Sequence, residues 1–217
     1  MLRITKVILT YKNKISQVLV LILVMPFTSQ LIFPQSHSIM SYNIRYDNEW
    51  DKVNSWEIRK DEVIKLIYEY DPGIIGIQEG LLNQVQYINN ALNDYDYFGV
   101  GRDDGKDKGE FCAIFYDKTR YDLQKSSTFW LSETPGKISV GWDAALERIC
   151  TYGLFLDKEK GQDFWVFNTH FDHIGSIARE KSAELILKKI ASLNYRNLPV
   201  IIMGDFNSTP GSPPIEK

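Results

Sequence analysis

The first half of the chain alternates between stretches with strand-like and helix-like apolar patterns. Residues 74–77 carry no charged or strongly polar side chain, which predicts a buried strand, and a weaker alternation over 38–46 predicts another. Two further stretches place apolar residues at helical spacing, namely Trp56, Val63, Ile67 and Tyr70, and then Leu81, Val85, Ile88 and Leu92. Strand, helix, strand and helix in this order predict an α/β fold.

The second half of the chain is richer in predicted strands. Apolar runs separated by short polar turns predict two hairpins, 111–116 with 121–131 and 146–156 with 163–169. A helical pattern over about 177–193 follows, and the apolar run 200–203 predicts one more buried strand. Since no internal repeat or linker divides this part of the sequence, we interpret residues 36–217 as one α/β domain.

Residues 1–35 have a different composition from the rest of the chain. They contain four basic residues and no acidic one, and the apolar run 18–25 is followed by Pro26. A basic start and a short apolar middle are typical of a secretory signal, and the run is short for a membrane span. We therefore predict export of the chain, secreted or periplasmic, with retention by an uncleaved N-terminal membrane anchor as the alternative.

Charge and cysteine content narrow the function classes. The formal net charge is −3, and the chain is more acidic still without the basic residues of 1–35. The sequence lacks a basic stripe that would bind long nucleic acid or an anionic membrane. Any phosphate chemistry therefore needs local cations, either a metal ion or a few arginines. The two cysteines, Cys112 and Cys150, can be interpreted as a disulfide or as two buried thiols, and neither fits a zinc-ligand pattern.

Polar side chains follow several predicted strands at the point where each strand ends. They are Asn43, Glu79, His170 and the pair Asp205 and Asn207. A carboxylate there can orient a water or bind a cation, and an amide can both donate to and accept from a phosphoryl group. The alternative is that Asp205 and Asn207 only bond the backbone of their own turn, and that Glu79 is a solvated carboxylate. His170 as a zinc ligand is disfavoured because the remaining ligands are missing.

Several sequence motifs are shared with a known family. Segments 41–47, 77–79, 168–170 and 204–207 resemble motifs of the endonuclease/exonuclease/phosphatase superfamily, whose fold is like that of deoxyribonuclease I. The resemblance covers residues 37–211. Segments 101–105, 128–135 and 141–145 are similar to a secreted bacterial subgroup. The resemblance implies a four-layer α/β/β/α sandwich, in which two packed mixed sheets are flanked by helices and the site lies at one edge.

The resemblance also implies roles for the strand-end residues. Glu79 matches the family's magnesium ligand, with Asn43 beside it at the metal and the phosphate; Mg²⁺ is the implied ion and Mn²⁺ the alternative. Asp205 matches the residue that aligns or deprotonates the attacking water, and Asn207 the one that holds the phosphoryl group. His170 matches a phosphate-binding or acid/base histidine.

The resemblance implies roles for two further residues, which are matched to the family by position more than by a motif. Glu110 matches the carboxylate that orients the histidine, and we expect it to open a strand after Gly109. Arg148 lies where family members place a phosphate-contacting arginine, although from its sequence context alone a surface cation is the more frequent outcome. The loop 101–109 is charged and rich in glycine, and because it precedes a predicted strand and not a helix, a surface position is favoured over a phosphate cradle.

The implied activity is hydrolysis of a phosphomonoester or phosphodiester by an activated water. The substrate would be nucleic acid, a nucleotide, a phospholipid head group or a sugar phosphate, and no protein partner is implied. Family members carry a further Asp and then an Asp-His pair near the C-terminus, which are missing before Lys217. An impaired or inactive fragment that lacks the last strands of the second sheet is therefore the alternative. A binding module of unrelated class is a third, and it would not need these side chains to meet.

Overall fold

The computed structural model describes residues 38–217, so the predicted signal over 1–35 lies outside the described residues. The first sheet has the strand order β1-β2-β4-β3 and the second the order β5-β6-β7-β8. The strands of the first sheet are β1 (Ile39–Asn43), β2 (Ile74–Gln78), β3 (Tyr95–Phe98) and β4 (Ile114–Asp117). Those of the second are β5 (Tyr121–Trp130), β6 (Ile149–Asp157), β7 (Gln162–His170) and β8 (Val200–Asp205).

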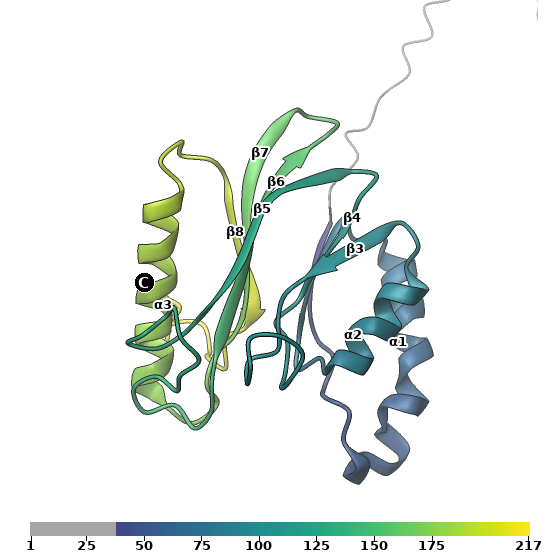
Figure 1. Cartoon of the computed structure of the whole chain (residues 1–217), viewed down its shortest axis with the longest axis horizontal. Helices are drawn as coiled ribbons and strands as arrows, with labels where there is room; N and C mark the ends of the chain where they lie inside the picture. The colour runs from purple at the N-terminus through teal and green to yellow at the C-terminus, as the bar shows by residue number, and fades with distance from the viewer. Residues whose placement is uncertain (1–37) are drawn as a thin grey trace, which may run out of the picture. The chain divides into compact units, whose positions relative to one another are not determined.

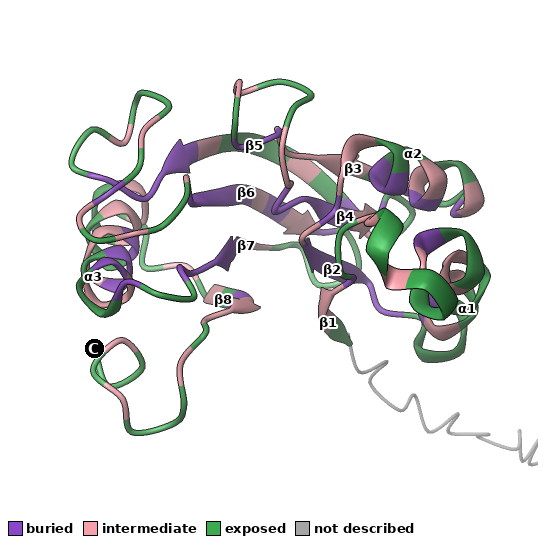
Figure 2. Cartoon of the chain, turned by 90° about the horizontal axis from the view of Figure 1, so that it is seen from below, coloured by how far each residue is buried: buried purple, intermediate pink, exposed green. Residues whose placement is uncertain are grey.

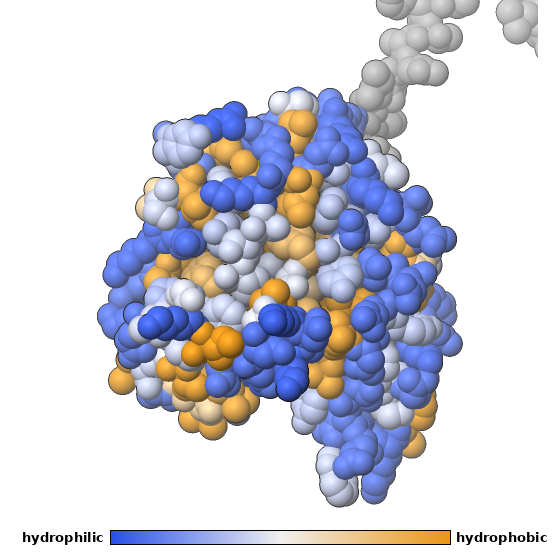
Figure 3. Space-filling view, viewed as in Figure 1, coloured by the Kyte–Doolittle hydropathy of each residue, from blue (hydrophilic) through white to orange (hydrophobic). Residues whose placement is uncertain are grey.

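Helices cover the outer face of each sheet (Figure 1). α1 (Trp56–Tyr70) and α2 (Leu82–Ala91) lie on the first sheet, α3 (Ser176–Leu193) lies on the second, and the short 3-10 helix η1 (Glu49–Asn54) precedes α1. The four layers are those expected from the sequence, and each sheet mixes parallel with antiparallel pairs. Figure 3 shows mainly hydrophilic residues over α1 and α2, as suits helices with one solvated side. Within the described residues, no helix is both long and apolar enough to span a membrane.

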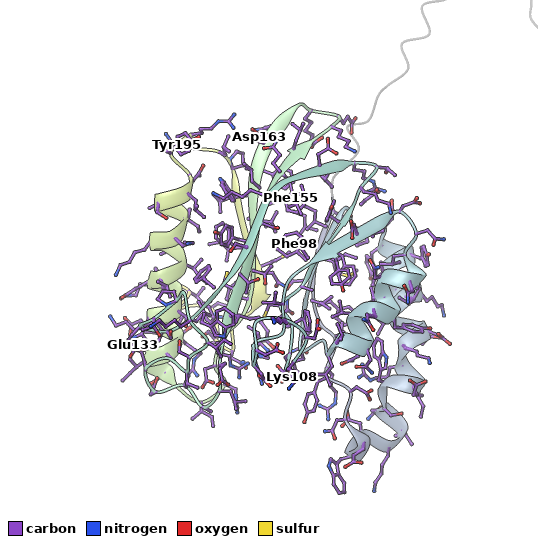
Figure 4. The ribbon with its side chains drawn as sticks, viewed as in Figure 1. Phe98, Lys108, Glu133, Phe155, Asp163 and Tyr195 are labelled. Carbon is purple, nitrogen blue, oxygen red and sulfur yellow. The ribbon has the colours of Figure 1, made fainter. Side chains whose placement is uncertain are left out.

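The space between the two sheets, called the seam below, is filled by apolar side chains from both. Its buried members are Ile74, Ile114, Tyr121, Phe155, Val166 and Met203. Phe98 of the first sheet and Phe155 of the second face one another there, with ring centroids 6.0 Å apart (Figure 4). Buried positions concentrate on the central strands β2, β6 and β7 (Figure 2).

A buried amide network joins the sheets at the seam. Asn168, which is fully buried, donates from Nδ2 to the carbonyls of Ile77 and Ala113 at 2.8 and 2.9 Å. Its Oδ1 accepts from Gln78 Nε2 at 2.7 Å. Gly76 makes the close approach feasible, since a Cβ there would lie 2.8 Å from the Asn168 side chain. Buried polar groups are tolerated when they are hydrogen-bonded in this way.

One of the two predicted hairpins is wrong. The second hairpin is confirmed, because β6 and β7 pair antiparallel across the turn after Asp157. The first does not form: β4 pairs with β2 and β3 in one sheet, whereas β5 pairs with β6 in the other. The apolar pattern locates the strands and the turn, but it does not distinguish a hairpin from a crossing between sheets. Strand β3 is only four residues long and was not predicted.

Candidate active site

Strand direction brings the predicted site residues to one edge of the sandwich. β1 and β2 are parallel, with Asn43 opposite Gln78, and β7 and β8 are parallel, with His170 opposite Asp205. Each parallel pair is joined by a helical crossover, so that the carboxyl ends of both strands lie at the same edge. β1 and β2 also contact β8 across the seam. The ends of four strands from two sheets therefore meet.

The two-residue period of a strand directs these side chains into the seam. On β7, His170 follows Val166 and Asn168, and on β8, Asp205 follows Ile201 and Met203; the earlier members of both series pack in the seam. Glu79 follows directly after β2 and would point the other way in an extended chain. Its φ of 63° turns the backbone instead, and such a left-handed conformation in a non-glycine residue often marks a functional position.

One side-chain amide connects the two carboxylates of the site. Asn43 Nδ2 donates to Glu79 Oε1 at 2.8 Å and to Asp205 Oδ2 at 3.0 Å. The other oxygen of Asp205 accepts the backbone N–H of Asn207 at 3.0 Å. The local turn that was the alternative interpretation of Asp205 is thus present, but it uses only one of the two Asp205 carboxylate oxygens. The second oxygen faces Asn43 from the opposite sheet.

His170 lies on the other side of Asp205. Its Nε2 is 3.9 Å from Asp205 Oδ2 and 3.1 Å from Asn207 Nδ2, which also donates to the Phe171 carbonyl at 2.9 Å. Asn43 and His170 therefore both approach the same carboxylate oxygen. The structure brings together Asn43, Glu79, His170, Asp205 and Asn207, although their catalytic and metal-binding roles stay predictions.

The electrostatics leave His170 neutral and Asp205 ionised at neutral pH. Burial, assisted by the positive charge of Arg148, lowers the pKa of His170 to about 4. Burial alone would raise the pKa of Asp205, but hydrogen bonds from Asn207 and Asn43 outweigh it, and the net direction is downward. A neutral imidazole and an ionised carboxylate side by side can both accept protons.

Arg148, for which a surface position was the more frequent outcome, is buried, with 4% of its surface exposed. It directly precedes β6 and bonds two residues that follow His170 in the chain. Its Nε is 3.3 Å from Asp172 Oδ2, and its Nη2 is 2.9 Å from His173 Nδ1. Backbone N–H groups of Gly175 and others outweigh the effect of burial and lower the pKa of Asp172 to about 2. The guanidinium is therefore held by a firmly ionised partner.

Glu110 lies near His170 but bonds a different residue. Its Oε2 is 4.0 Å from His170 Nδ1, beyond hydrogen-bonding distance. Both of its oxygens accept from Arg102, at 2.9 and 3.0 Å. The expectation that Glu110 opens a strand is wrong, because β4 begins only at Ile114. Arg102 is also buried, so the loop 101–109 is not wholly at the surface, and this residue was missed by the sequence reasoning.

Among residues 38–217, no group of three or more His, Cys, Asp or Glu side chains is arranged to hold a metal ion. Magnesium needs fewer protein ligands than such a group provides, because it is commonly bound by one or two carboxylates together with water and substrate phosphate. Glu79 is half-buried, and its Oε2 has only a 3.3 Å bond from the Tyr46 backbone N–H. Asn43 points its amide nitrogen at both carboxylates, while its oxygen accepts from the Arg45 N–H. The Glu79 carboxylate therefore fits a hard cation, whereas Asn43 would have to exchange its present hydrogen bonds to offer its oxygen.

Cys112 and Cys150 are both buried free thiols, which decides between the two interpretations made from sequence. Burial raises the pKa of Cys112 to about 12. A buried thiol with a raised pKa is a poor nucleophile and metal ligand. Neither cysteine contributes reactive chemistry to the site.

A two-sheet sandwich with amide, carboxylate and imidazole groups at one edge defines a known class of fold and site. The sequence model of the Endonuclease/Exonuclease/phosphatase family matches residues 40–217, and the chain belongs to this family. A solved structure of a mannosyl-6-phosphatase from Bacteroides thetaiotaomicron is 44% identical, with a TM-score of 0.81 over 83% of this chain and 69% of that chain.

Two curated relatives extend the comparison. The uncharacterized protein L388 of Acanthamoeba polyphaga mimivirus is 30% identical over 170 residues, which cover 75% of this chain and 63% of the viral protein. The 3'-5'-exoribonuclease subunit Ccr4 of the CCR4-Not complex of Mycosarcoma maydis is 28% identical in a match that covers 81% of this chain and 34% of the relative. The chain thus spans less than two thirds of the length of these curated relatives.

Proposed function

We propose that this chain carries the catalytic edge of a divalent-metal-dependent phosphoesterase. The observation that supports the proposal most directly is the Asn43 amide, which bonds the Glu79 and Asp205 carboxylates from two different sheets. His170 and Asn207 adjoin the same Asp205 carboxylate. A module of unrelated class would have no need for this convergence.

The protein's own groups suit attack by water on a phosphoryl group. Asp205 is ionised and accessible, and it would orient the attacking water and accept its proton. With substrate bound, Asn207 would redirect the amide N–H that it gives to His170 toward a phosphoryl oxygen, and Nε2 of the neutral His170 would then be free to accept or return a proton. A Mg²⁺ or Mn²⁺ ion held at Glu79, when bound, supplies positive charge to polarise a phosphoryl oxygen. Arg148 adds a fixed positive charge behind the site.

A small phosphate ester is the substrate class that we propose first. The similarity to a mannosyl-6-phosphatase over most of this chain supports a sugar phosphomonoester. The net negative charge of the chain also disfavours long nucleic acid, for which affinity comes largely from basic residues on the protein. The similarity to an exoribonuclease subunit supports a phosphodiester as the second candidate.

The test compares the full chain with its Glu79→Gln variant on two substrates, a hexose 6-phosphate and an aryl phosphodiester, with and without Mg²⁺. We expect metal-dependent hydrolysis that falls at least about 100-fold in the variant, as for the loss of one charge-stabilising group. Glu62→Gln on the exposed side of α1 is the matched control and should keep full activity. Equal turnover by wild type and Glu79→Gln would exclude the assigned role.

If the wild type hydrolyses neither substrate, with or without Mg²⁺, the alternative is favoured, namely a protein that binds metal and phosphate but does not hydrolyse the ester. Isothermal titration with Mg²⁺ and inorganic phosphate separates these outcomes. A binding-only protein should bind both ligands in the wild type and bind Mg²⁺ weakly in Glu79→Gln.

We also propose that residues 1–35 direct export of the chain. Support comes from their basic start and short apolar run. Fusion of these residues to a reporter that is active only outside the cytoplasm tests the proposal, and a reporter that stays inactive contradicts it.

A further inference from the structure

A mostly buried ion pair lies next to His170, and one of its two partners, Arg102, has no role predicted from the sequence. Arg102 donates from both terminal nitrogens to the Glu110 carboxylate, and its backbone N–H bonds the Glu110 carbonyl at 3.2 Å. The Arg102 and Glu110 side chains are only 11% and 17% exposed. Two parallel bonds between a guanidinium and a carboxylate fix the orientation of both groups. Glu110 is thus set by Arg102 before any contact with His170.

The loop between the two partners is anchored as well. Trp130 of β5 donates its Nε1 to the Arg102 carbonyl at 2.9 Å. The Asp104 carboxylate accepts the backbone N–H groups of Lys106 and Lys108 at 2.8 and 2.9 Å, and Lys108 lies on this loop at the lower edge of the sandwich in Figure 4. The loop therefore closes on the ion pair, and Arg102 has little freedom to release Glu110.

The hydrogen bonds of His170 show which ring nitrogen faces the pair. An amide nitrogen only donates, and Asn207 Nδ2 is oriented by the Phe171 carbonyl, so His170 Nε2 accepts from it. The neutral ring then carries its proton on Nδ1, 4.0 Å from Glu110 Oε2. Within residues 38–217, His170 Nδ1 and Arg102 Nε are among the few buried side-chain nitrogens without a hydrogen-bond partner. Arg102, Glu110 and His170 line the same small cavity.

We propose that Arg102 is a positioning residue for His170. By holding both oxygens of Glu110, it keeps this carboxylate facing Nδ1 while preventing a closed ion pair with the ring. Arg102 thereby adds to burial and Arg148 in keeping His170 neutral in the free protein, and it provides a carboxylate neighbour for the moment at which Nε2 takes up a proton. The role of the protonated ring rests on the proposed function, whereas the effect of Arg102 on the ring does not.

The charges around His170 come from several elements. They are Glu79 after β2, Arg102 and Glu110 in the loop before β4, Arg148 before β6 and Asp205 at the end of β8. Positive neighbours disfavour the imidazolium and negative neighbours favour it. Removal of the Arg102 charge, which also frees Glu110 to move to Nδ1, therefore changes the balance toward protonation.

The test is an NMR titration of the full chain with isotope-labelled histidine nitrogens, which reports both the tautomer and the pKa of His170. We expect the proton on Nδ1 in the wild-type protein, and Arg102→Met should raise the pKa by about one unit. Arg102→Lys keeps the charge and should restore most of the wild-type value. Arg120→Met is the matched control, since it removes an ion-paired arginine in the turn after β4, and it should leave the His170 titration unchanged.

A wild-type ring protonated on Nε2, or the same pKa in wild type and Arg102→Met, would overturn the proposal. If Arg102→Met does not fold, as judged by near-ultraviolet circular dichroism, Glu110→Gln takes its place. That variant removes a negative neighbour and should lower the His170 pKa further, and an unchanged value would count against the proposal. Because no turnover is measured, the result is independent of whether the proposed phosphoesterase activity exists. In an active protein, Arg102→Met should lower kcat about tenfold with KM nearly unchanged, as expected for a residue that acts through the acid/base group.

Discussion

Asn168 is the residue for which the structure gives the clearest estimate of an energetic effect. Asn168→Ala removes three hydrogen bonds across the seam, two from Nδ2 and one to Oδ1. The Ala113 carbonyl keeps a bond from the Ile77 N–H at 3.0 Å and Gln78 Nε2 keeps the Gly76 carbonyl at 3.0 Å, so these two groups avoid the larger penalty of a buried group left unpaired. At about 1 kcal/mol for each buried bond, we expect a loss of about 3 kcal/mol in the free energy of unfolding.

Urea denaturation of the full chain measures this loss. With a dependence on urea of about 2 kcal/mol per molar, the midpoint should fall by about 1.5 M. Asn168→Asp retains the side-chain volume but places a carboxylate oxygen against two carbonyls, so it should destabilise at least as much as alanine. Asn90→Ala on the exposed side of α2 is the control and should change stability by less than about 0.5 kcal/mol. A loss below about 1 kcal/mol for Asn168→Ala would refute the argument that this amide holds the sheets together.

Two other predictions follow from the contacts at the site. Asp172 has a folded-state pKa of about 2, below its ordinary value, so its contribution to stability is complete above about pH 4 and is lost as the pH falls toward 2. Asp172→Asn should therefore cost about 2 kcal/mol at neutral pH in thermal or urea unfolding and much less near pH 2, and an equal cost at both values would contradict the assignment. Asn43→Ala leaves Glu79 and Asp205 facing each other without the bridging amide, so we expect Mg²⁺-dependent turnover, where present, to fall at least about 100-fold. An Asn43→Ala protein with wild-type turnover would show that the bridge does not serve catalysis.

The sequence alone was sufficient to predict that the site residues lie at the ends of strands. His170 and Asp205 each follow a clear apolar pattern and Asn43 a weaker one, and parallel strands joined by a helix end at a common edge. The two-residue period then determines which face they occupy. These are local and topological regularities, so they can be derived from a single chain. The wrong hairpin at 117–120 shows the limit, because the pairing of β4 depends on β3, a strand too short to be detected.

The buried arginines could not be placed by the same reasoning. Arg102 and Arg148 lie in loops, and their burial depends on the partners Glu110, Asp172 and His173, which reach them only through the tertiary fold. A charged residue in a polar loop is usually solvated, so the local pattern favours the wrong environment. Arg102 and Glu110 stand on either side of a glycine-rich loop, and this spacing could have suggested an ion pair between them. It would not have predicted the geometry of the pair.

The position of the site at the seam gives fold and chemistry a shared physical basis. Glu79 comes from one sheet and Asp205 from the other, and like charges brought together in a partly buried edge oppose the packing of the sheets. The Asn43 amide offsets this repulsion by donating to both, and a bound cation would do so more strongly. We therefore expect the arrangement that costs stability in the free protein to favour binding of the proposed cation, which would link metal binding to the association of the two sheets.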